Sequence, residues 1–316
     1  MKSYQPAKTL LSVIVIVLLS SGCTGSSTQP VHQQTAPEQG QEATPDIRVT
    51  TTFTITADMV AAIGGEHVTV TSLTPPGADI HSYEPTPTDI VTAQHSDLIV
   101  EHGLGLDSWL STMTNSVSSA RITVTEGITP IPIAAGEYEG VPNPHAWLSA
   151  ANAHIYTANI VRVLSDIAPE HAAEFAERGR AYSDRIDTQF EQIRELTETI
   201  PPENRTVVTC EGAFSYLTAE LGFTEAWLWP VNAEREATPR RVAAVIDTVR
   251  DQEIPTVFCE STVGDKPMRL VTEDTGASFG GVLYVDSLTD AAGPAPTYLD
   301  LLSYNATVIT QGLTTS

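Results

Sequence analysis

A long stretch of helical periodicity occupies the middle of the chain, from Pro169 to Ile200. Apolar residues recur there every three or four positions after one longer gap, as on the buried face of an amphipathic helix. They are Phe175, Tyr182, Ile186, Phe190, Ile193, Leu196 and Ile200. Pro169 suits a first helical turn, and the Pro201-Pro202 pair prevents continuation. About 32 residues would reach roughly 48 Å. We therefore expect a rigid helix joining two lobes, and the alternative is a long helix packed on one domain.

Strand-like and helix-like segments alternate on both sides of this helix. Strands fit residues 48–55, 67–73, 97–101, 122–125, 206–209, 226–228, 256–258 and 279–285. Helices fit residues 56–64, 106–117, 149–167, 213–221, 239–252, 267–275 and 297–312, and one more begins near residue 88. This alternation predicts an α/β fold with parallel sheets and helices on both faces. We expect an N-terminal lobe at 47–168, a linking helix at 169–200 and a C-terminal lobe at 201–316.

The first 46 residues are typical of a targeting segment and a tether. Residues 1–22 contain Lys2, Lys8 and an apolar run that is too short to span a bilayer. Cys23 follows Leu-Ser-Ser-Gly, which resembles a lipobox, although Ser20 stands where bacterial lipoboxes usually have Leu. We expect Cys23 to be acylated, with a plain secretory signal as the alternative. Residues 23–46 are rich in Ser, Thr, Gln and Pro, which predicts a flexible tether.

Charge and cysteine content narrow the function classes. The signal segment holds two of the 16 basic residues and none of the 39 acidic ones, so the mature chain has a net charge of −25. We therefore do not expect the protein to bind nucleic acid or anionic lipid surfaces. Cys210 and Cys259 each end an apolar strand-like run and precede a Glu. They could form an extracytoplasmic disulfide if those strands are neighbours, or remain two buried thiols.

Four residues lie where predicted strands pass into loops, which is where ligands bind in such folds. They are His81, His145, Glu211 and Asp286, two in each half of the chain. Two imidazoles and two carboxylates suit a divalent ion such as Mn²⁺ or Fe²⁺. Their separations of 64, 66 and 75 residues form no local motif. Hydrogen-bonded loop histidines and helix-capping acids are the alternative reading of the same residues.

The segments around these residues resemble one known family. They include His81-Ser-Tyr-Glu-Pro-Thr-Pro, Asn143-Pro-His-Ala-Trp-Leu, Glu211-Gly-Ala-Phe-Ser-Tyr-Leu, Glu260-Ser-Thr-Val-Gly-Asp-Lys-Pro and Gly280-Gly-Val-Leu-Tyr-Val-Asp-Ser-Leu. The chain is similar over 47–316 to the metal-binding solute receptors of manganese, iron and zinc ABC importers, also called the cluster A-I or adhesin-lipoprotein family. Residues 285–302 are especially similar to its manganese and chelated-iron branch.

The resemblance implies a function and a ligand set. It places the metal ligands at His81, His145, Glu211 and Asp286. It implies a lipid-anchored receptor on the outer face of the cytoplasmic membrane, a monomer that delivers Mn²⁺ or Fe²⁺ to an ABC permease and its ATPase and has no enzyme activity.

Two departures from zinc-selective relatives favour manganese or iron. Such relatives typically have a third His where Glu211 stands, and a His-rich loop where residues 134–143 contain no His. Zinc remains the alternative, and an inward-facing Cys210 thiolate would favour it.

A hydrolase is the other competing class, either a metal-dependent one or a serine hydrolase. Gly276-Ala-Ser-Phe-Gly matches the G-x-S-x-G pattern around Ser278. That motif requires a strand before the serine and a helix after it, whereas the sequence here predicts the opposite order.

Overall fold

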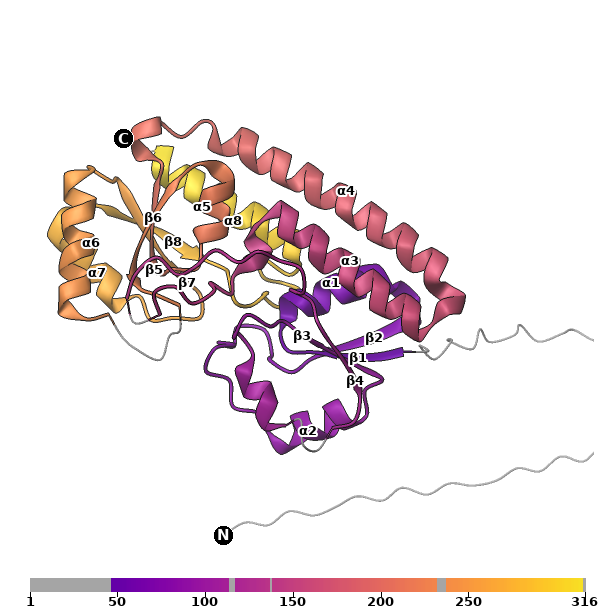
Figure 1. The fold of residues 1–316 in the computed structure, drawn as a ribbon. Coiled ribbons are helices and arrows are strands. Elements are labelled where there is room, and N and C mark those ends of the chain that lie inside the picture. The colour runs from indigo at the N-terminus through magenta and orange to yellow at the C-terminus, as the bar shows by residue number, and fades with distance from the viewer. Residues whose placement is uncertain (1–46, 114–116, 137, 232–236, 315–316) are drawn as a thin grey trace, which may run out of the picture. The chain divides into compact units, whose positions relative to one another are not determined.

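A computed structural model describes residues 47–113, 117–136, 138–231 and 237–314 (Figure 1). The predicted signal segment, Cys23 and the tether lie outside the described residues. No helix among the described residues is both long and apolar enough to cross a membrane.

The first half of the chain forms a parallel sheet of four strands in the order β2-β1-β3-β4. Its strands are β1 (Ile47–Thr51), β2 (Val68–Ser72), β3 (Leu98–Glu101) and β4 (Ala120–Thr123). Successive residues of β3 point to opposite faces. Leu98 and Val100 join the main core, whereas Ile99 packs with Leu110 in a smaller cluster. Both faces of the sheet are therefore covered, as predicted.

The helices of this half are α1 (Thr54–Gly64), α2 (Pro87–Gln94) and α3 (Ala150–Ile167). The helix predicted at 106–117 is wrong in type, because the described residues of that range form the short 3₁₀-helix η2 (Ser108–Thr112) and no α-helix. Asp107 explains the change: its side chain accepts hydrogen bonds from the backbone N–H groups of His102 and Gly103, which fixes a loop at this point.

The second half contains two parallel strand pairs, β5-β6 and β7-β8, with β5 next to β7. The strands are β5 (Thr206–Glu211), β6 (Thr224–Trp229), β7 (Thr256–Glu260) and β8 (Ser278–Leu283). The helices are α5 (Ser215–Leu221), α6 (Pro239–Asp251), α7 (Lys266–Thr275) and α8 (Tyr298–Thr314). A disulfide joins Cys210 to Cys259, so the disulfide alternative is the one that the structure contains. The predicted α/β class with parallel sheets is confirmed.

The long middle helix begins with a 3₁₀ turn, η5 (Pro169–His171), and continues as α4 (Ala172–Thr197). Six of the seven residues predicted on its apolar face are buried. Leu196 is the exception, with 37% of its surface exposed, and the next residue, Thr197, is buried instead. The Thr197 hydroxyl donates to the Ile193 carbonyl, so this polar side chain is satisfied inside the core.

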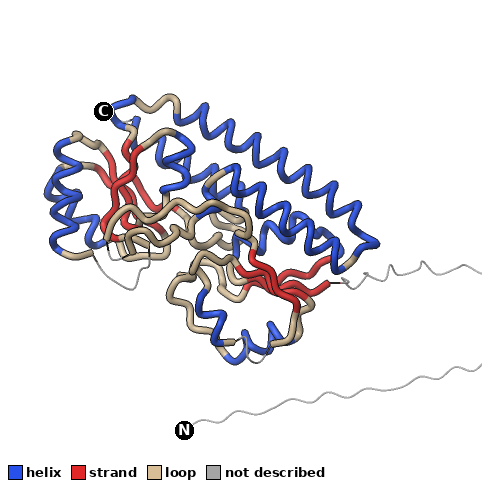
Figure 2. Tube along the Cα trace, in the orientation of Figure 1, coloured by secondary structure: helices blue, strands red, loops and turns tan. Residues whose placement is uncertain are grey.

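Helix α4 packs against elements from both halves of the chain, namely α1 and α3 from the first half and α8 from the second. One hydrophobic core accordingly includes Val49 and Ile160 from the first half and Phe214 and Leu302 from the second. Figure 2 shows the strands in two groups. The described residues nevertheless belong to one compact unit, and the division into lobes at 168 and 201 stays a proposal.

His102, directly after β3, is fully buried in this core. Its Nδ1–H donates to the Gly103 carbonyl at 2.8 Å, and its Nε2 accepts from the Tyr156 hydroxyl at 2.6 Å. Burial lowers the pKa of His102 from 6.5 to about 3, and the nearby imidazoles of His145 and His81 act in the same direction. The ring therefore stays neutral in the folded protein.

We predict that Phe190→Ala lowers the free energy of unfolding by about 3–5 kcal/mol, because it leaves a cavity under α4 where both halves pack. The exposed neighbour Glu191 provides the control, and Glu191→Ala should change stability by less than about 0.5 kcal/mol. Urea unfolding followed by circular dichroism measures both. Equal effects of the two changes would contradict the role given to this face of α4.

His102 should also make stability depend on pH. As the pH falls below 6.5, the unfolded chain protonates this ring and the folded chain does not, so stability is lost towards a pH of about 3. Between pH 7 and pH 5 the protonation of this one ring in the unfolded chain lowers the free energy of unfolding by about 2 kcal/mol. Urea unfolding of metal-free protein should show the parent losing that much more than His102→Asn over this range. Other titrating groups cancel in this comparison, and equal losses would exclude the effect.

Candidate metal centre

The four predicted ligands come together from four separate segments. His81 lies in the loop after β2, and His145 directly precedes the 3₁₀-helix η4 (Ala146–Leu148) that leads into α3. Glu211 is the last residue of β5, and Asp286 lies three residues beyond the end of β8. One donor atom from each lies within 4.8 Å of the others. The carboxyl ends of strands from both halves therefore converge on this point.

The separations between these donor atoms are those of a single coordination shell. His81 Nε2 lies 3.4 Å from His145 Nε2, 3.5 Å from Glu211 Oε1 and 3.8 Å from Asp286 Oδ1. His145 Nε2 lies 3.2 Å from Asp286 Oδ1 and 3.9 Å from Glu211 Oε1. Ligands at about 2.1 Å from a tetrahedral ion are about 3.4 Å apart, and those around an octahedral ion about 3.0 Å. A divalent ion fits among these four groups.

A neighbouring amide fixes the chemical state of His145. Its Nδ1–H donates to Asn143 Oδ1 at 2.8 Å, which leaves the lone pair on Nε2 facing the other donors. The amide orientation is itself fixed, because Asn143 Nδ2 donates to the Gly212 carbonyl at 2.8 Å and to Ser215 Oγ at 3.2 Å. Histidine ligands usually have such a partner on the ring nitrogen that faces away from the metal.

The carboxylates are buried and held by their own partners. Burial acts to raise the pKa of Asp286, but without a metal a proton shared with His145 and the positive charge that His145 and His81 carry when protonated bring it below the usual value. Thr262 Oγ1 donates to Asp286 Oδ2 at 3.2 Å, so Oδ1 is the oxygen that faces the histidines. Two ionised carboxylates with two neutral imidazoles would balance the charge of one divalent cation.

Glu260, the last residue of the neighbouring strand β7, supports Glu211. Both its carboxyl oxygens lie within 3.3 Å of the Glu211 backbone N–H, which donates to them. Burial raises the pKa of Glu260 well above its usual range, and the charges of Asp286 and Glu225 act in the same direction. This shift favours the neutral form of Glu260, which adds no third negative charge beside the site.

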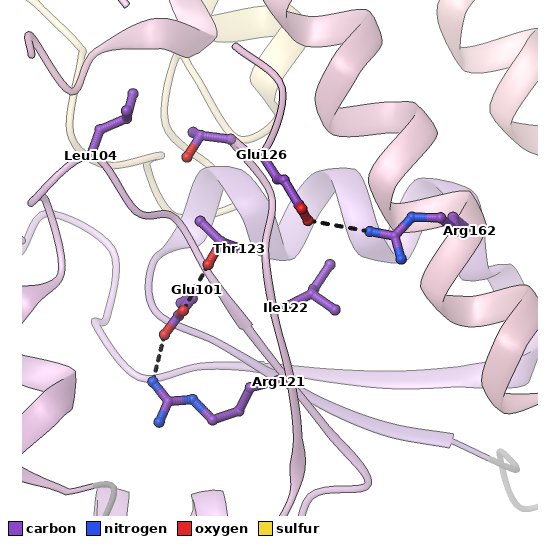
Figure 3. Close-up of a pocket in the computed structure, with 8 residues that line it drawn as sticks. Glu101, Leu104, Arg121, Ile122, Thr123, Glu126 and Arg162 are labelled. Atoms are coloured by element: carbon purple, nitrogen blue, oxygen red, sulfur yellow. Dashed lines mark hydrogen bonds and ion pairs between the residues drawn. The ribbon is translucent and has the colours of Figure 1, made fainter.

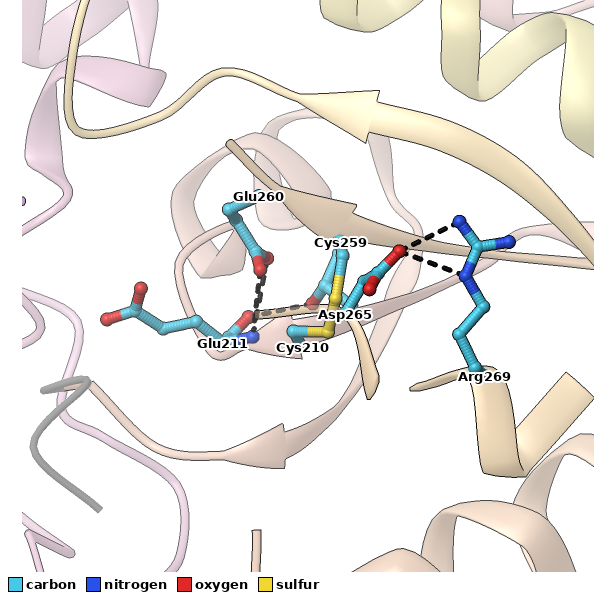
Figure 4. The surroundings of a disulfide bond; sticks show 7 residues. Cys210, Glu211, Cys259, Glu260, Asp265 and Arg269 are labelled. Atoms are coloured by element: carbon cyan, nitrogen blue, oxygen red, sulfur yellow. Dashed lines mark hydrogen bonds and ion pairs between the residues drawn. A yellow bond between two sulfur atoms is a disulfide. The ribbon is translucent and has the colours of Figure 1, made fainter. Parts of the chain in front are cut away.

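The disulfide lies one residue before both of these acids. Figure 4 shows Cys210 and Cys259 bonded beside Glu211 and Glu260, with 4.9 Å between the two Cα atoms. Both cysteines are buried. A Cys210 thiolate turned towards a metal, the alternative that would have favoured zinc, is excluded by this bond.

Two polar contacts tie together loops from opposite halves of the chain. The Ser287 hydroxyl, next to Asp286, accepts from the Gly77 N–H at 2.7 Å in the loop that carries His81. The Asn143 amide makes a corresponding link from the His145 loop to Gly212, next to Glu211. Sequence reasoning missed both residues. The position of Asn143 two residues before His145 was the available signal.

Other candidates lie elsewhere. Glu101 ends β3, but it pairs with Arg121 at 2.6 Å and accepts from Thr123 at 2.7 Å in a separate surface depression (Figure 3). Ser278 is exposed and begins β8 directly after α7, so the strand follows the serine instead of preceding it. This order is opposite to that of a nucleophile elbow.

Comparison with known proteins gives a consistent result. Residues 49–312 match the family described as ZnuA, zinc-uptake complex component A, periplasmic. The iron-binding protein YfeA of Yersinia pestis is 47% identical over 266 residues, which cover 84% of this chain and 86% of that protein. The manganese ABC transporter substrate-binding lipoprotein PsaA of Streptococcus mitis is 30% identical, with 96% of each chain covered.

A solved structure agrees with these matches. The Mn-bound periplasmic metal-binding protein from Candidatus Liberibacter asiaticus has a TM-score of 0.78 and 39% identity, and the match covers 84% of this chain and 99% of that one. The predicted family is therefore confirmed: this chain belongs to the ZnuA family of periplasmic metal-binding receptors.

Proposed function

We propose that this protein captures Mn²⁺ or Fe²⁺ outside the cytoplasmic membrane and delivers it to an ABC permease driven by its ATPase. His81, His145, Glu211 and Asp286 are the proposed ligands. The observation that carries the proposal is their geometry: Nε2 of each histidine lies 3.2–3.9 Å from a carboxylate oxygen of both acids. Each half of the chain contributes two of these four ligands, which together are called the cage below.

The donor set supports the choice of metal. Two carboxylates beside two imidazoles suit Mn²⁺ and Fe²⁺, whereas more nitrogen or sulfur would favour Zn²⁺. The similar proteins YfeA and PsaA are named for iron and manganese. Zinc usually binds such sites tightly in vitro as well, so the metal acquired in native medium is the informative measurement.

Coordination without catalysis follows from the same site. Four protein ligands leave little room for a metal-bound water of the kind that hydrolytic metal sites activate. The ligand side chains are at most 5% exposed, which also restricts access by a second substrate. We infer that the protein is a receptor and not an enzyme.

The N-terminal residues complete the proposal. Acylation of Cys23 would anchor the protein on the outer face of the membrane, and residues 23–46 would tether the folded part near the permease. The protein would act as a monomer, since one chain supplies all four proposed ligands.

Glu211→Ala and Asp286→Ala should each weaken Mn²⁺ binding by at least about 100-fold, because residues that only orient metal ligands already contribute about 10–100-fold. Elemental analysis of protein purified from native-like medium should give one Mn²⁺ or Fe²⁺ per parent chain and almost none in either variant. Isothermal titration of the metal-free proteins gives the affinities.

Glu225 provides the matched control, because it is a nearby, partly buried acid that instead accepts hydrogen bonds from Phe214 N–H and the Ser215 hydroxyl. Glu225→Gln should retain full metal content. Unchanged content in the Glu211 and Asp286 variants would refute the ligand assignment. Zinc in the parent from medium that also supplies manganese and iron would favour the zinc alternative.

Asn143→Ala should weaken Mn²⁺ binding by about 10–100-fold without abolishing it, because His145 would lose the acceptor that fixes its tautomer. Asn159 offers a comparison, since its amide donates to the Val124 and Glu126 carbonyls and to no ligand. Isothermal titration should show Asn159→Ala binding like the parent. Equal affinities for all three proteins would exclude a positioning role for Asn143.

A further inference from the structure

A second group of metal-ligating side chains lies where the long helix begins. His67 ends the 3₁₀-helix η1 (Gly65–His67) just before β2, His171 ends η5, and Glu174 lies in the first turn of α4. One donor atom from each lies within 4.8 Å of the others. Figure 1 shows this end of α4 near β2. None of the three takes part in the proposed cage.

The Glu174 carboxylate bridges the two imidazoles. His67 Nε2 lies 2.9 Å from Glu174 Oε2, and His171 Nδ1 lies 3.8 Å from Glu174 Oε1. The hydrogen bond from His67 lowers the pKa of Glu174, so the carboxylate is ionised at neutral pH. Two nitrogen donors and an anionic oxygen therefore face one small volume.

The protein framework keeps these side chains next to one another. The two imidazole rings stack with 3.7 Å between centroids, and both meet the buried ring of Phe175 edge-on. His171 and Glu174 are three residues apart at the start of α4, which puts them on the same face. The donors thus come from two separate segments of the chain, one before β2 and one at the start of α4, and both segments pack on the buried ring of Phe175.

The chemistry differs from that of the cage. The side chains of His67, His171 and Glu174 are 14%, 20% and 49% exposed, so water would complete the coordination of an ion here. Two imidazoles, one carboxylate and water form a ligand set that Zn²⁺ accepts readily. We propose that His67, His171 and Glu174 form a second, solvent-accessible site for a divalent cation of borderline character such as Zn²⁺.

Two features of the cluster predict that this site is weaker than the cage. A ligating nitrogen directs its lone pair in the ring plane, so the stacked rings must turn to point at one ion, and their partial exposure allows this. The Arg178 guanidinium lies 3.6 Å from Glu174 Oε2 and competes with a cation for that oxygen. An ion bound here would clamp the start of α4 to the segment before β2.

Titration of metal-free full-length protein with Zn²⁺ tests the proposal. In the parent, calorimetry should resolve a second, weaker class of binding sites that takes one ion per chain. His67→Gln and His171→Gln should each weaken that class by about 10-fold or more while the tighter class keeps its affinity. Arg178→Gln should strengthen it by about three- to five-fold, since a positive charge about 5 Å from the ion is removed.

His154 supplies the matched control. It also pairs with a surface carboxylate, that of Asp187 at 2.7 Å, but this pair includes only one histidine. His154→Gln should leave both classes unchanged. A parent without a weaker class, or a weaker class unaffected in both His67→Gln and His171→Gln, would overturn the proposal. The cage is tested separately by Asp286→Ala, which should remove the tighter class alone.

Discussion

The structure depends on holding two carboxylates and two imidazoles together in a buried site. His145 Nε2 presents a lone pair 3.2 Å from Asp286 Oδ1, and Asn143 holds the proton on the opposite ring nitrogen. Such groups repel one another when no cation or proton lies between them, and burial strengthens that repulsion. The rest of the fold must offset this cost, and it does so by packing and by hydrogen bonds between the loops that carry the ligands.

Three features provide these stabilising contacts. Helix α4 contacts α1, α3 and α8, so the two halves share one hydrophobic core. Ser287 joins the Asp286 loop to the His81 loop, and Asn143 joins the His145 loop to the residue after Glu211. Wide separation of the halves would break these links and expose the core. Loop movement is therefore the expected way for an ion to enter and leave, and His81, with the most exposed ligand side chain, is well placed for it.

Periodicity predicted the elements well where burial alone decides them. The apolar face of α4 and the parallel α/β class follow from local patterns. Position after a strand or before a helix made the quartet only one of two readings, and the resemblance to the receptor family is what selected it. Local patterns could not predict contacts between distant segments. The apolar spacing puts Leu196 on the buried face, and only the structure shows that Thr197 lies there instead, with its hydroxyl bonded to the Ile193 carbonyl. Asn143, Ser287 and the His67–His171 pair depend on contacts across 69 or more residues, which no spacing reveals. For the same reason the sequence left open whether Cys210 and Cys259 form a disulfide, because it does not show that β5 and β7 are neighbours.

The disulfide has a consequence for when the protein reaches its final form. It closes a loop of 49 residues, which contributes about 4 kcal/mol by restricting the unfolded chain. Such bonds persist in oxidising compartments and are reduced in the cytosol. Because the bond lies one residue before Glu211 and Glu260, it links covalently the two strands that carry these acids. This link is gained only in an oxidising compartment, which is also where the proposed receptor would meet its metal.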